Sequence, residues 1–280
     1  MAEIALSAPA KLNLILRVGP LAPDGYHPLE SLLVTLGAPC DRVRVGVSAG
    51  ERVVESAEAP GPDNLAWAAL DAFERATGID VPLYVKIDKR IPAKAGLGGG
   101  SSDAAATLRA ANEIHGRPLD RAALEGVAAD VGSDVPFFIR GGAQWARGRG
   151  EALTPTSMPA DLNLAVIDGG VELSTAAVYR AVDELEPDEL PAPDDRIPAG
   201  PVWEWSENYL WPAAQALAPA LDRMDRELRE AGAQGTLLCG SGGSMAGMFA
   251  TPSDLSAAHA ALESTYPTWT TRTASPHVTG

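Results

Sequence analysis

The chain is 280 residues long, and its 46% hydrophobic and 21% charged residues fit a globular protein of one large or two modest domains. Its 22 Lys and Arg against 37 Asp and Glu give a net charge of −15, which argues against nucleic acid or a membrane surface as a partner. The two cysteines, Cys40 and Cys239, predict neither a disulfide framework nor a zinc site, and they favour the reducing cytoplasm. The stretch from Met1 to Leu6 shows no signal sequence, and no apolar run is long enough to span a membrane.

The first predicted element is a strand over residues 11–18, where apolar and polar residues alternate. One face carries Leu12, Leu14, Leu16 and Val18, and the other carries Lys11, Asn13 and Arg17. We expect an antiparallel strand with a solvated polar face. The turn that follows contains Tyr26 and His27, which serve equally well as turn residues or as a ring and an imidazole for a planar base.

Further short strands are predicted over residues 29–36, 41–48 and 52–56, separated by Gly37, Pro39 and Gly50. Asn64 and Gly78 bracket a helix over residues 65–77, and residues 83–88 predict another strand. Because strands cluster before helices instead of alternating with them, the pattern favours an α+β fold.

The stretch from Ile91 to Ala106 predicts a glycine-rich turn that leads directly into a helix. Four glycines within five residues, Gly96 and Gly98 to Gly100, allow positive φ values and bring backbone N–H groups close to a ligand. Ser101, Ser102 and Asp103 are suitable N-cap or first-turn residues, and Gly116 ends the helix. The loop therefore lies at the positive end of a helix, where phosphate is favoured. A tight turn without a ligand is the alternative, and the sequence of a P-loop NTPase is absent.

Asp134 follows a helix predicted over residues 120–131 and precedes the apolar run from Val135 to Ile139, which we predict as a strand. A buried, unpaired carboxylate there would be costly, so Asp134 either caps an element or pairs with a cation. Lys11 is the candidate cation.

The second half of the chain is predicted to begin near Pro155 to Pro159, which divides it into domains 1–157 and 158–280. We expect a strand from Leu162, helices over residues 174–182, 219–230 and 254–264, and a strand over residues 245–250. A proline-rich, acidic excursion occupies residues 186–201, and a second glycine cluster occupies residues 240–244.

Four stretches resemble the GHMP kinase superfamily: Pro-Ala-Lys-Leu-Asn-Leu from Pro9, Asp-Gly-Tyr-His from Asp24, Gly96 to Ala106, and Asp-Val-Pro-Phe-Phe from Asp134. The resemblance implies an α+β protein with an ATP-binding N-terminal domain of the ribosomal-protein-S5 type and a ferredoxin-like C-terminal domain. Gly243, Ser133 and Tyr209 depart from the family pattern.

The resemblance also implies roles for individual residues. Lys11 and Asp134 would be the catalytic pair, and Asn13, Tyr26, His27, Thr175 and Tyr179 would join them as substrate contacts. The ATP site would consist of Asn64, Pro92, Ala93, Lys94, Ala95, Gly96, Leu97, Gly98, Gly99, Gly100, Ser101 and Ser102.

The implied reaction transfers the γ-phosphoryl group of ATP, with Mg²⁺, to an alcohol that carries a cytidine diphosphate group. Asp134 would accept the proton of the hydroxyl, and Lys11 would keep the Asp134 carboxylate ionised. One rival is a related kinase for homoserine, mevalonate or a sugar. Another is a nucleotide-binding regulator without activity. A homodimer stays open as an alternative to a monomer.

Overall fold

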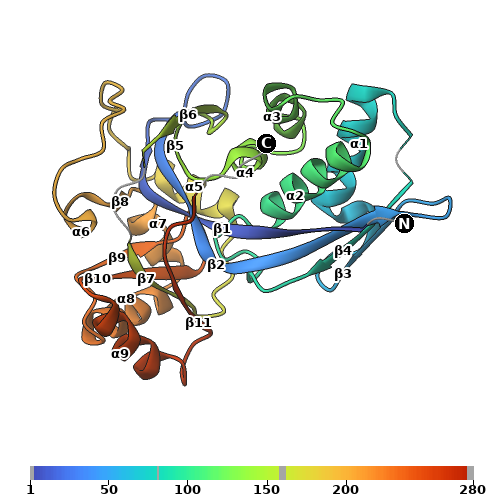
Figure 1. The fold of residues 1–280 in the computed structure, drawn as a ribbon. Helices are drawn as coiled ribbons and strands as arrows, with labels where there is room; N and C mark the ends of the chain where they lie inside the picture. Colours follow the sequence, from blue (N-terminus) through green and yellow to red (C-terminus); the bar gives the residue numbers. More distant parts are fainter. Residues whose placement is uncertain (1–2, 81, 158–161, 276–280) are drawn as a thin grey trace.

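Two β-sheets organise the protein, which we describe from a computed structural model over residues 3–80, 82–157 and 162–275 (Figure 1). The first sheet has seven strands in the order β3-β4-β2-β1-β8, with β5 paired to β2 and β6 to β5. Its strands are β1 (Glu3–Val18), β2 (Leu29–Val47), β3 (Val53–Ser56), β4 (Leu83–Asp88), β5 (Ala143–Gly148), β6 (Ala152–Thr156) and β8 (Glu207–Asn208).

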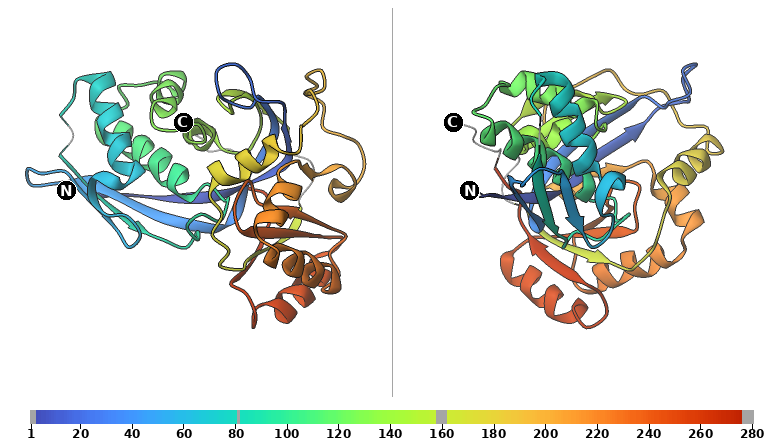
Figure 2. Two further views of the ribbon diagram at one scale, coloured as in Figure 1. Left: turned by 180° about the vertical axis from the view of Figure 1, so that it is seen from behind. Right: turned by 90° about the vertical axis from the view of Figure 1, so that its right-hand side faces the viewer.

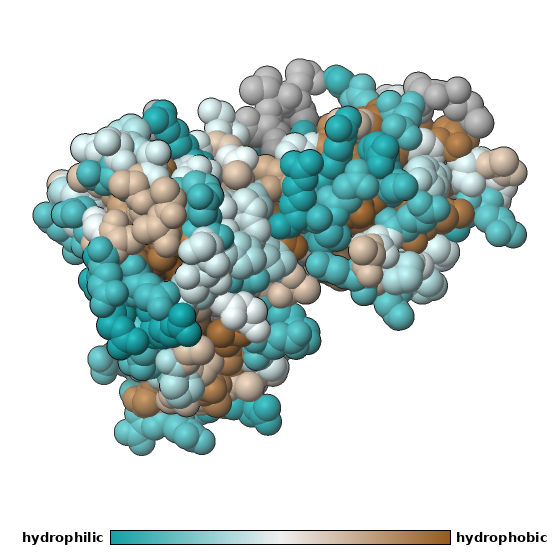
Figure 3. Space-filling view, turned by 90° about the horizontal axis from the view of Figure 1, so that it is seen from below, coloured by the Kyte–Doolittle hydropathy of each residue, from teal (hydrophilic) through white to brown (hydrophobic). Residues whose placement is uncertain are grey.

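The second sheet is antiparallel, with the order β11-β7-β10-β9. Its strands are β7 (Asn163–Asp168), β9 (Gly235–Leu238), β10 (Ser244–Phe249) and β11 (Thr268–Thr271). Figure 2 shows that this sheet and its helices form a lobe beside one end of the first sheet. Seen from below, the molecule is bent, and its surface is mainly hydrophilic with hydrophobic residues in small separate areas (Figure 3).

Four helices cover one face of the first sheet: α1 (Leu65–Thr77), α2 (Gly99–Ile114), α3 (Arg121–Ala129) and α4 (Val135–Arg140). Their apolar residues and those of β1, β2 and β4 form one core, which includes the fully buried Phe73 and Phe137. The remaining helices are the 3-10 turn η1 (Gly61–Asp63), α5 (Thr175–Asp183), α6 (Val202–Trp205), α7 (Trp211–Leu217), α8 (Ala220–Glu230) and α9 (Pro252–Leu262).

A second core joins the two sheets. It contains Leu12 and Leu14 of β1, Trp145 of β5, and Leu164 and Met248 of the second sheet. Burial of this apolar surface at about 25 cal/mol per Å² fixes the two sheets against each other. The pocket described below lies where they meet.

The predicted strands over residues 29–36 and 41–48 are one strand, β2, which is a correction to the sequence analysis. Gly37 and Pro39 do not end the strand, because the residues between Thr35 and Cys40 form an irregularity in its pairing with β1. Pro9 pairs with Cys40, and Lys11 already pairs with Thr35. Extra residues in one strand of an antiparallel pair bend the sheet without breaking it.

The predicted strand over residues 135–139 is also wrong, because these residues form helix α4. Short apolar runs do not distinguish a buried strand from a buried helix. Pro136, in the first turn of α4, is well placed there because its missing N–H is not needed. All five apolar residues are buried.

The acidic excursion over residues 186–201 contains no helix or strand, and Asp195 anchors it to β5. The Asp195 carbonyl accepts a bond from Trp145 Nε1 at 3.0 Å, and its carboxylate pairs with Arg147 at 2.6 Å. The predicted domain boundary at 157/158 borders residues 158–161, which lie outside the described residues. No helix in the described part of the chain is long and apolar enough to cross a membrane.

Candidate active site

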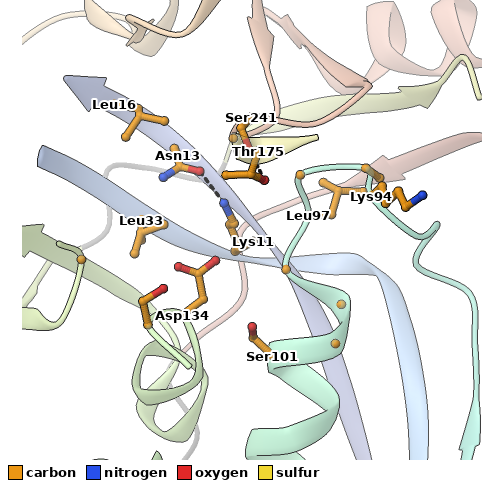
Figure 4. Close-up of a pocket in the computed structure, with 18 of the residues that line it drawn as sticks. Lys11, Asn13, Leu16, Leu33, Lys94, Leu97, Ser101, Asp134, Thr175 and Ser241 are labelled. Carbon is orange, nitrogen blue, oxygen red and sulfur yellow. Dashed lines mark hydrogen bonds between the residues drawn. The ribbon is translucent and has the colours of Figure 1, made fainter. Parts of the chain in front are cut away.

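A cavity of about 590 Å³ opens between the glycine loop, the strands β1 and β2, and helix α5 (Figure 4). Residues from both halves of the chain line it. The lining consists of Lys11, Asn13, Leu16, Leu29, Ser31, Leu33, Glu58, Leu65, Lys89, residues 92–101, Ser133, Asp134, Ala146, Arg149, Gly150, Thr175, Tyr179, Leu210, Gly240 and Ser241.

The glycine loop follows the predicted course into α2, with positive φ at Lys94 (55°), Gly96 (77°) and Gly98 (72°). The helix begins at Gly99, its N-cap is Gly98, and no side chain caps it. Ser101 and Ser102 therefore lie in the first turn, and the N-cap alternative is wrong. Because no side chain satisfies the first N–H groups of α2, they are available to an anion in the pocket.

Lys11 projects from β1 into the pocket, held by a chain of hydrogen bonds. Its Nζ donates to Asn13 Oδ1 at 2.7 Å, Asn13 Nδ2 donates to Ser31 Oγ at 2.8 Å, and Ser31 donates to the Ile15 carbonyl at 2.7 Å. The Lys11 backbone N–H bonds the Leu97 carbonyl at 3.0 Å, which ties β1 to the glycine loop.

The polar face of β1 is therefore not solvated as predicted, because Lys11 and Asn13 are only 6% and 5% exposed. The pairing of β1 with β2 also slips after Asn13, where Asn13 pairs with Leu33 and Ile15 with Leu32. One extra residue reverses the alternation of faces. Leu16, predicted on the apolar face, consequently lines the pocket with Lys11.

Asp134 lies immediately before α4 and borders the same pocket as Lys11, whose ammonium is directed toward Asn13 (Figure 4). Asp134 makes no capping hydrogen bond with its side chain. Lys11 and Asp134 form no ion pair in the described structure. The predicted pair therefore lies in one pocket without direct contact. Burial and the charge of Asp134 raise the pKa of Tyr179 to about 12, which keeps its phenol neutral.

The other predicted substrate residues form two groups. Thr175 and Tyr179 line the pocket, and Thr175 Oγ1 lies 2.8 Å from Ser241 Oγ of the second glycine cluster. His27 does not line it, because its Nδ1 bonds the Gly19 carbonyl at 2.8 Å and its Nε2 lies 3.1 Å from Asp183. The ring of His27 packs 5.6 Å from that of Tyr179 and so supports it.

Tyr26 is 53% exposed at the rim of the pocket and is not among its lining residues. The guanidinium of Arg149, which does line the pocket, lies 3.8 Å from the centre of the Tyr26 ring. Asp24 holds Arg149 in place through an ion pair of 2.7 Å. One face of the Tyr26 ring is thus covered by a cation.

The structure separates Asn64, which was expected in the ATP site, from the pocket wall. Asn64 caps α1: its Oδ1 accepts from the Ala66 N–H at 2.9 Å and its Nδ2 donates to the Ala59 carbonyl at 2.7 Å. Its neighbour Leu65 lines the pocket instead. Ser102 is buried behind the loop, and its hydroxyl has no partner among the described residues.

A charged cluster supports the base of the glycine loop. Lys89 Nζ lies 2.6 Å from Asp41 and 2.8 Å from Asp103, and both carboxylates are almost completely buried. Asp41 also accepts the backbone N–H groups of Arg90 and Ile91 at the start of the loop. The cluster therefore fixes the strand before the loop to the helix after it. Burial raises the pKa of the Asp103 carboxyl to about 7, opposed by the charge of Lys89.

The two glycine clusters touch backbone to backbone. A Cβ at Gly96 would lie 1.7 Å from the Cys239 carbonyl oxygen, and one at Gly242 would lie 2.1 Å from Gly96 N. Lys94 bridges the same gap at the surface, where its Nζ pairs with Glu172 at 2.7 Å. A Cβ at Gly243 would lie 1.8 Å from the Val171 carbonyl oxygen, so this backbone accommodates glycine alone.

Sequence reasoning missed several residues of the pocket, notably Ser31, Glu58, Lys89 and Arg149. Two of them carry a signal that could have been used. Arg149 stands between Gly148 and Gly150 in a tight turn, and Lys89 is a cation immediately before the glycine loop. Ser31 has no such signal, because its role depends on the register between β1 and β2.

Comparison with known proteins first defines the class. The family model described as GHMP kinases N terminal domain matches residues 64–142. A solved homoserine kinase from Cytophaga hutchinsonii shares the fold with a TM-score of 0.71, covering 99% of this chain and 96% of that one at 18% identity. The fold is that of a GHMP-type, ATP-dependent small-molecule kinase.

The relatives then narrow the family. A 4-diphosphocytidyl-2-C-methyl-D-erythritol kinase of Anaeromyxobacter dehalogenans (strain 2CP-C) is 43% identical over 252 residues, covering 86% of this chain and 79% of that protein. One from Desulfitobacterium hafniense (strain Y51) is 35% identical over 279 residues, covering 97% and 96%. A crystal structure of 4-(cytidine 5'-diphospho)-2C-methyl-D-erythritol kinase aligns with a TM-score of 0.80 and 32% identity, covering 96% and 99%. The chain belongs to the 4-diphosphocytidyl-2-C-methyl-D-erythritol kinase family, and the α+β, two-domain fold class expected from the sequence is confirmed.

Proposed function

We propose that the chain transfers the γ-phosphoryl group of ATP to the 2-hydroxyl of 4-diphosphocytidyl-2-C-methyl-D-erythritol, a step of non-mevalonate isoprenoid precursor synthesis. The observation that carries this proposal is the convergence of Lys11 and Asp134 on one pocket with the glycine loop. Phosphoryl transfer requires little covalent chemistry from the protein, so positioning and charge stabilisation must lower the barrier.

Asp134 accepts the proton of the attacking hydroxyl in this mechanism. Its carboxylate is free of capping bonds and faces the pocket, as a general base requires. Within the described residues the Lys11 ammonium donates one hydrogen bond, to Asn13, so its other two N–H donors are available to Asp134 and to the transferring group. Its positive charge favours the ionised form of Asp134 and stabilises charge that develops on the phosphoryl oxygens.

The glycine loop and the first turn of α2 bind the β- and γ-phosphates. Backbone N–H groups from Gly96 to Ser101 line the pocket at the positive end of the helix. Lys94 contributes mainly through its backbone, because its ammonium is paired with Glu172.

Mg²⁺ bound with ATP fits this site through few protein ligands. The described residues contain no cluster of three metal-binding side chains, and a nucleotide-bound Mg²⁺ keeps several waters and phosphate oxygens. Ser101 on the pocket wall is the hydroxyl that the loop offers to the ion, and Ser102, whose hydroxyl has no partner among the described residues, is buried behind it. The ion would neutralise charge on the phosphates.

The cytidine group binds at the rim, between Tyr26 and Tyr179, with Asn13 and Thr175 directed toward the rest of the substrate. Tyr26 offers an aromatic ring at the rim, and Tyr179 is held by His27. Asn64 would act on the adenine only indirectly, through the position of Leu65.

We also propose a division of the chain at 157/158 and a cytoplasmic location. The two free cysteines support the cytoplasmic location. A homodimer would leave this site intact, because the pocket residues named above come from one chain.

The test measures ADP release and ATP binding for Asp134→Asn and Lys11→Ala. We expect each variant to lose most of its turnover and to bind ATP as the wild type does. A turnover of Asp134→Asn within about tenfold of the wild type, or ~1.4 kcal/mol, would refute the general-base role. The same assay with 2-C-methyl-D-erythritol lacking the cytidine diphosphate distinguishes the rival kinases, since equal rates with and without that group would contradict the proposed substrate.

A further inference from the structure

A second cavity of about 410 Å³ lies against the C-terminal half of α2, between this helix, the start of α3 and α4. Its lining shares no residue with the active-site pocket. Three arginines surround it in a chain whose net charge is −15. The lining is Arg109, Asn112, Glu113, Arg117, Leu119, Asp120, Arg121, Leu124 and Ile139.

Arg109 is the unusual member of this group. Within the described residues its guanidinium makes no hydrogen bond or ion pair, and its Nε is buried. Burial lowers the pKa of Arg109, with no acidic neighbour to oppose the effect. A cation that is partly removed from water without a partner destabilises the folded protein, and an anion in the adjoining cavity would offset that cost.

The carboxylates of the cavity are already used. Glu113 accepts two bonds from Arg117, at 2.6 and 3.3 Å, and Asp120 Oδ1 caps α3 through the Ala123 N–H at 2.8 Å. Asn112 is likewise occupied, by the backbone of Leu119. The three arginines and two carboxylates give the lining a formal net charge of +1. Within the described residues it is Arg109 that lacks a counterion.

The rest of the wall is apolar. Leu124 is buried, and Ile139 is almost completely buried. With Leu119 they offer a hydrocarbon surface beside the guanidinium groups. A ligand that fits both surfaces has an anionic head and a short hydrocarbon group.

We propose that this cavity binds a phosphate monoester with a short hydrocarbon substituent, with its phosphate held by Arg109. Guanidinium groups bind phosphate oxygens in pairs of parallel hydrogen bonds, and several of them can share one phosphate. The three terminal oxygens of a monoester suit a cavity with arginines on more than one side. The site is independent of the proposed substrate and of phosphoryl transfer, and it lies along the same helix that carries the glycine loop.

The test titrates n-butyl phosphate into the full chain by calorimetry, with a non-hydrolysable ATP analogue and the cytidylylated substrate saturating the active-site pocket. We expect one binding site in the wild type, at least tenfold weaker affinity in Arg109→Met, and an intermediate loss in Arg109→Lys, which keeps the charge without the planar fork. Arg223→Gln is the matched control, because Arg223 is an exposed arginine of α8 paired with Glu227 outside the cavity. Its affinity should equal that of the wild type.

Two further measurements test the cost of the unpaired charge and the preference for a phosphate head group. Arg109→Met should unfold at a higher temperature than the wild type without ligand, because it removes the unpaired charge and retains the packed stem, and n-butyl phosphate should then no longer stabilise it. n-Butyrate and n-butanol should bind at least tenfold more weakly than n-butyl phosphate. Equal affinities for butyrate and butyl phosphate, equal affinities for wild type and Arg109→Met, or no binding to the wild type would each overturn the proposal.

Discussion

At the scale of single residues, Arg149 is the cation at the rim of the pocket, stacked on Tyr26 and paired with Asp24. We predict that Arg149→Ala raises KM for the cytidylylated substrate about tenfold, or ~1.4 kcal/mol, because the diphosphate of the substrate loses a charge-assisted partner. kcat and KM for ATP should stay unchanged. Steady-state kinetics with both substrates provide the measurement, with the exposed Arg196→Ala as control.

A lower KM in Arg149→Ala would contradict this prediction. It would mean that the guanidinium blocks the ring face that the base needs. The two explanations predict opposite changes in KM, so the sign of the change in KM distinguishes them.

Asp103 predicts a dependence of stability on pH. Its pKa in the folded protein is about 7 against an ordinary 3.8, mainly because of burial, with Lys89 and Asp41 as its charged neighbours. Between these values the folded chain retains a proton that the unfolded chain has lost, so the contribution of Asp103 to stability is present below pH 4 and is lost as pH rises to 7. The Asp103→Asn variant lacks this loss.

We therefore expect the free energy of unfolding of Asp103→Asn, minus that of the wild type, to increase by a few kcal/mol between pH 4 and 7, since each pKa unit is worth about 1.4 kcal/mol. Above pH 7 the difference should level off. Urea unfolding across this range measures it, and Asp80→Asn, at an exposed position, serves as control. A constant difference from pH 4 to 8 would argue against a protonated Asp103 in the folded state.

The residues of the site were predictable to unequal degrees. The glycine loop was recognisable locally, because its function follows from the chemistry of neighbouring residues. The opposition of Lys11 and Asp134 depends on tertiary structure: the cost of burying a carboxylate suggested Lys11 as the cation for Asp134, and the resemblance implied that the two are the catalytic pair. The hydrogen bond of the Lys11 ammonium to Asn13, two positions along the same strand, at 2.7 Å was not predicted.

At the scale of elements, the start of α2 depends on Gly98. Its φ is +72°, and a Cβ there would lie 3.0 Å from both Lys11 Cγ and Phe138 Cζ. We predict that Gly98→Ala costs ~1–2 kcal/mol for the left-handed backbone and additionally displaces Lys11, with a marked loss of turnover. Denaturant unfolding and ADP release measure the two effects.

Gly116→Ala is the matched control, since Gly116 has a φ of +79° and no atom within 4 Å of the added Cβ. Gly116→Ala should lose only the stability that the left-handed backbone costs, and it should keep its turnover. Equal losses of stability in both variants, with full activity in Gly98→Ala, would show that the contact with Lys11 is unimportant.

The elements themselves were predicted best where local signals mark both ends. Helix α1 runs from Leu65 to Thr77 as expected, because the Asn64 side chain caps its start and Gly78 (φ 68°) ends it. β1 has the predicted alternation only as far as Asn13, since a bulge is set by pairing with β2 and leaves no trace in the sequence. α4 is apolar from Val135 to Ile139, so its periodicity could not distinguish helix from strand.

At the scale of the whole molecule, the two glycine clusters determine how the halves of the chain meet. Gly242→Ala would place a Cβ 2.1 Å from Gly96 N, which forces backbone away from backbone. We predict a loss of ATP affinity of at least tenfold and a lower unfolding temperature, because the glycine loop, the proposed site of the ATP phosphates, must shift. Calorimetry with ATP and thermal unfolding test this.

The control is Gly126→Ala on α3, where an added Cβ meets no atom within 4 Å. It should bind ATP normally and be slightly more stable, as expected for alanine within a helix. Wild-type ATP affinity in Gly242→Ala would show that the glycine loop keeps its conformation without support from the second cluster.

The short strand β8 affects how the protein is made. Glu207 and Asn208 pair in parallel with Ile15 and Leu16, and Asn208 Nδ2 also binds the Leu238 and Gly240 carbonyls. During synthesis on the ribosome, this end of β1 must wait for nearly two hundred further residues before its neighbour emerges. A nascent N-terminal half therefore presents an open sheet edge to other chains, and release before Asn208 is translated would favour aggregation over folding.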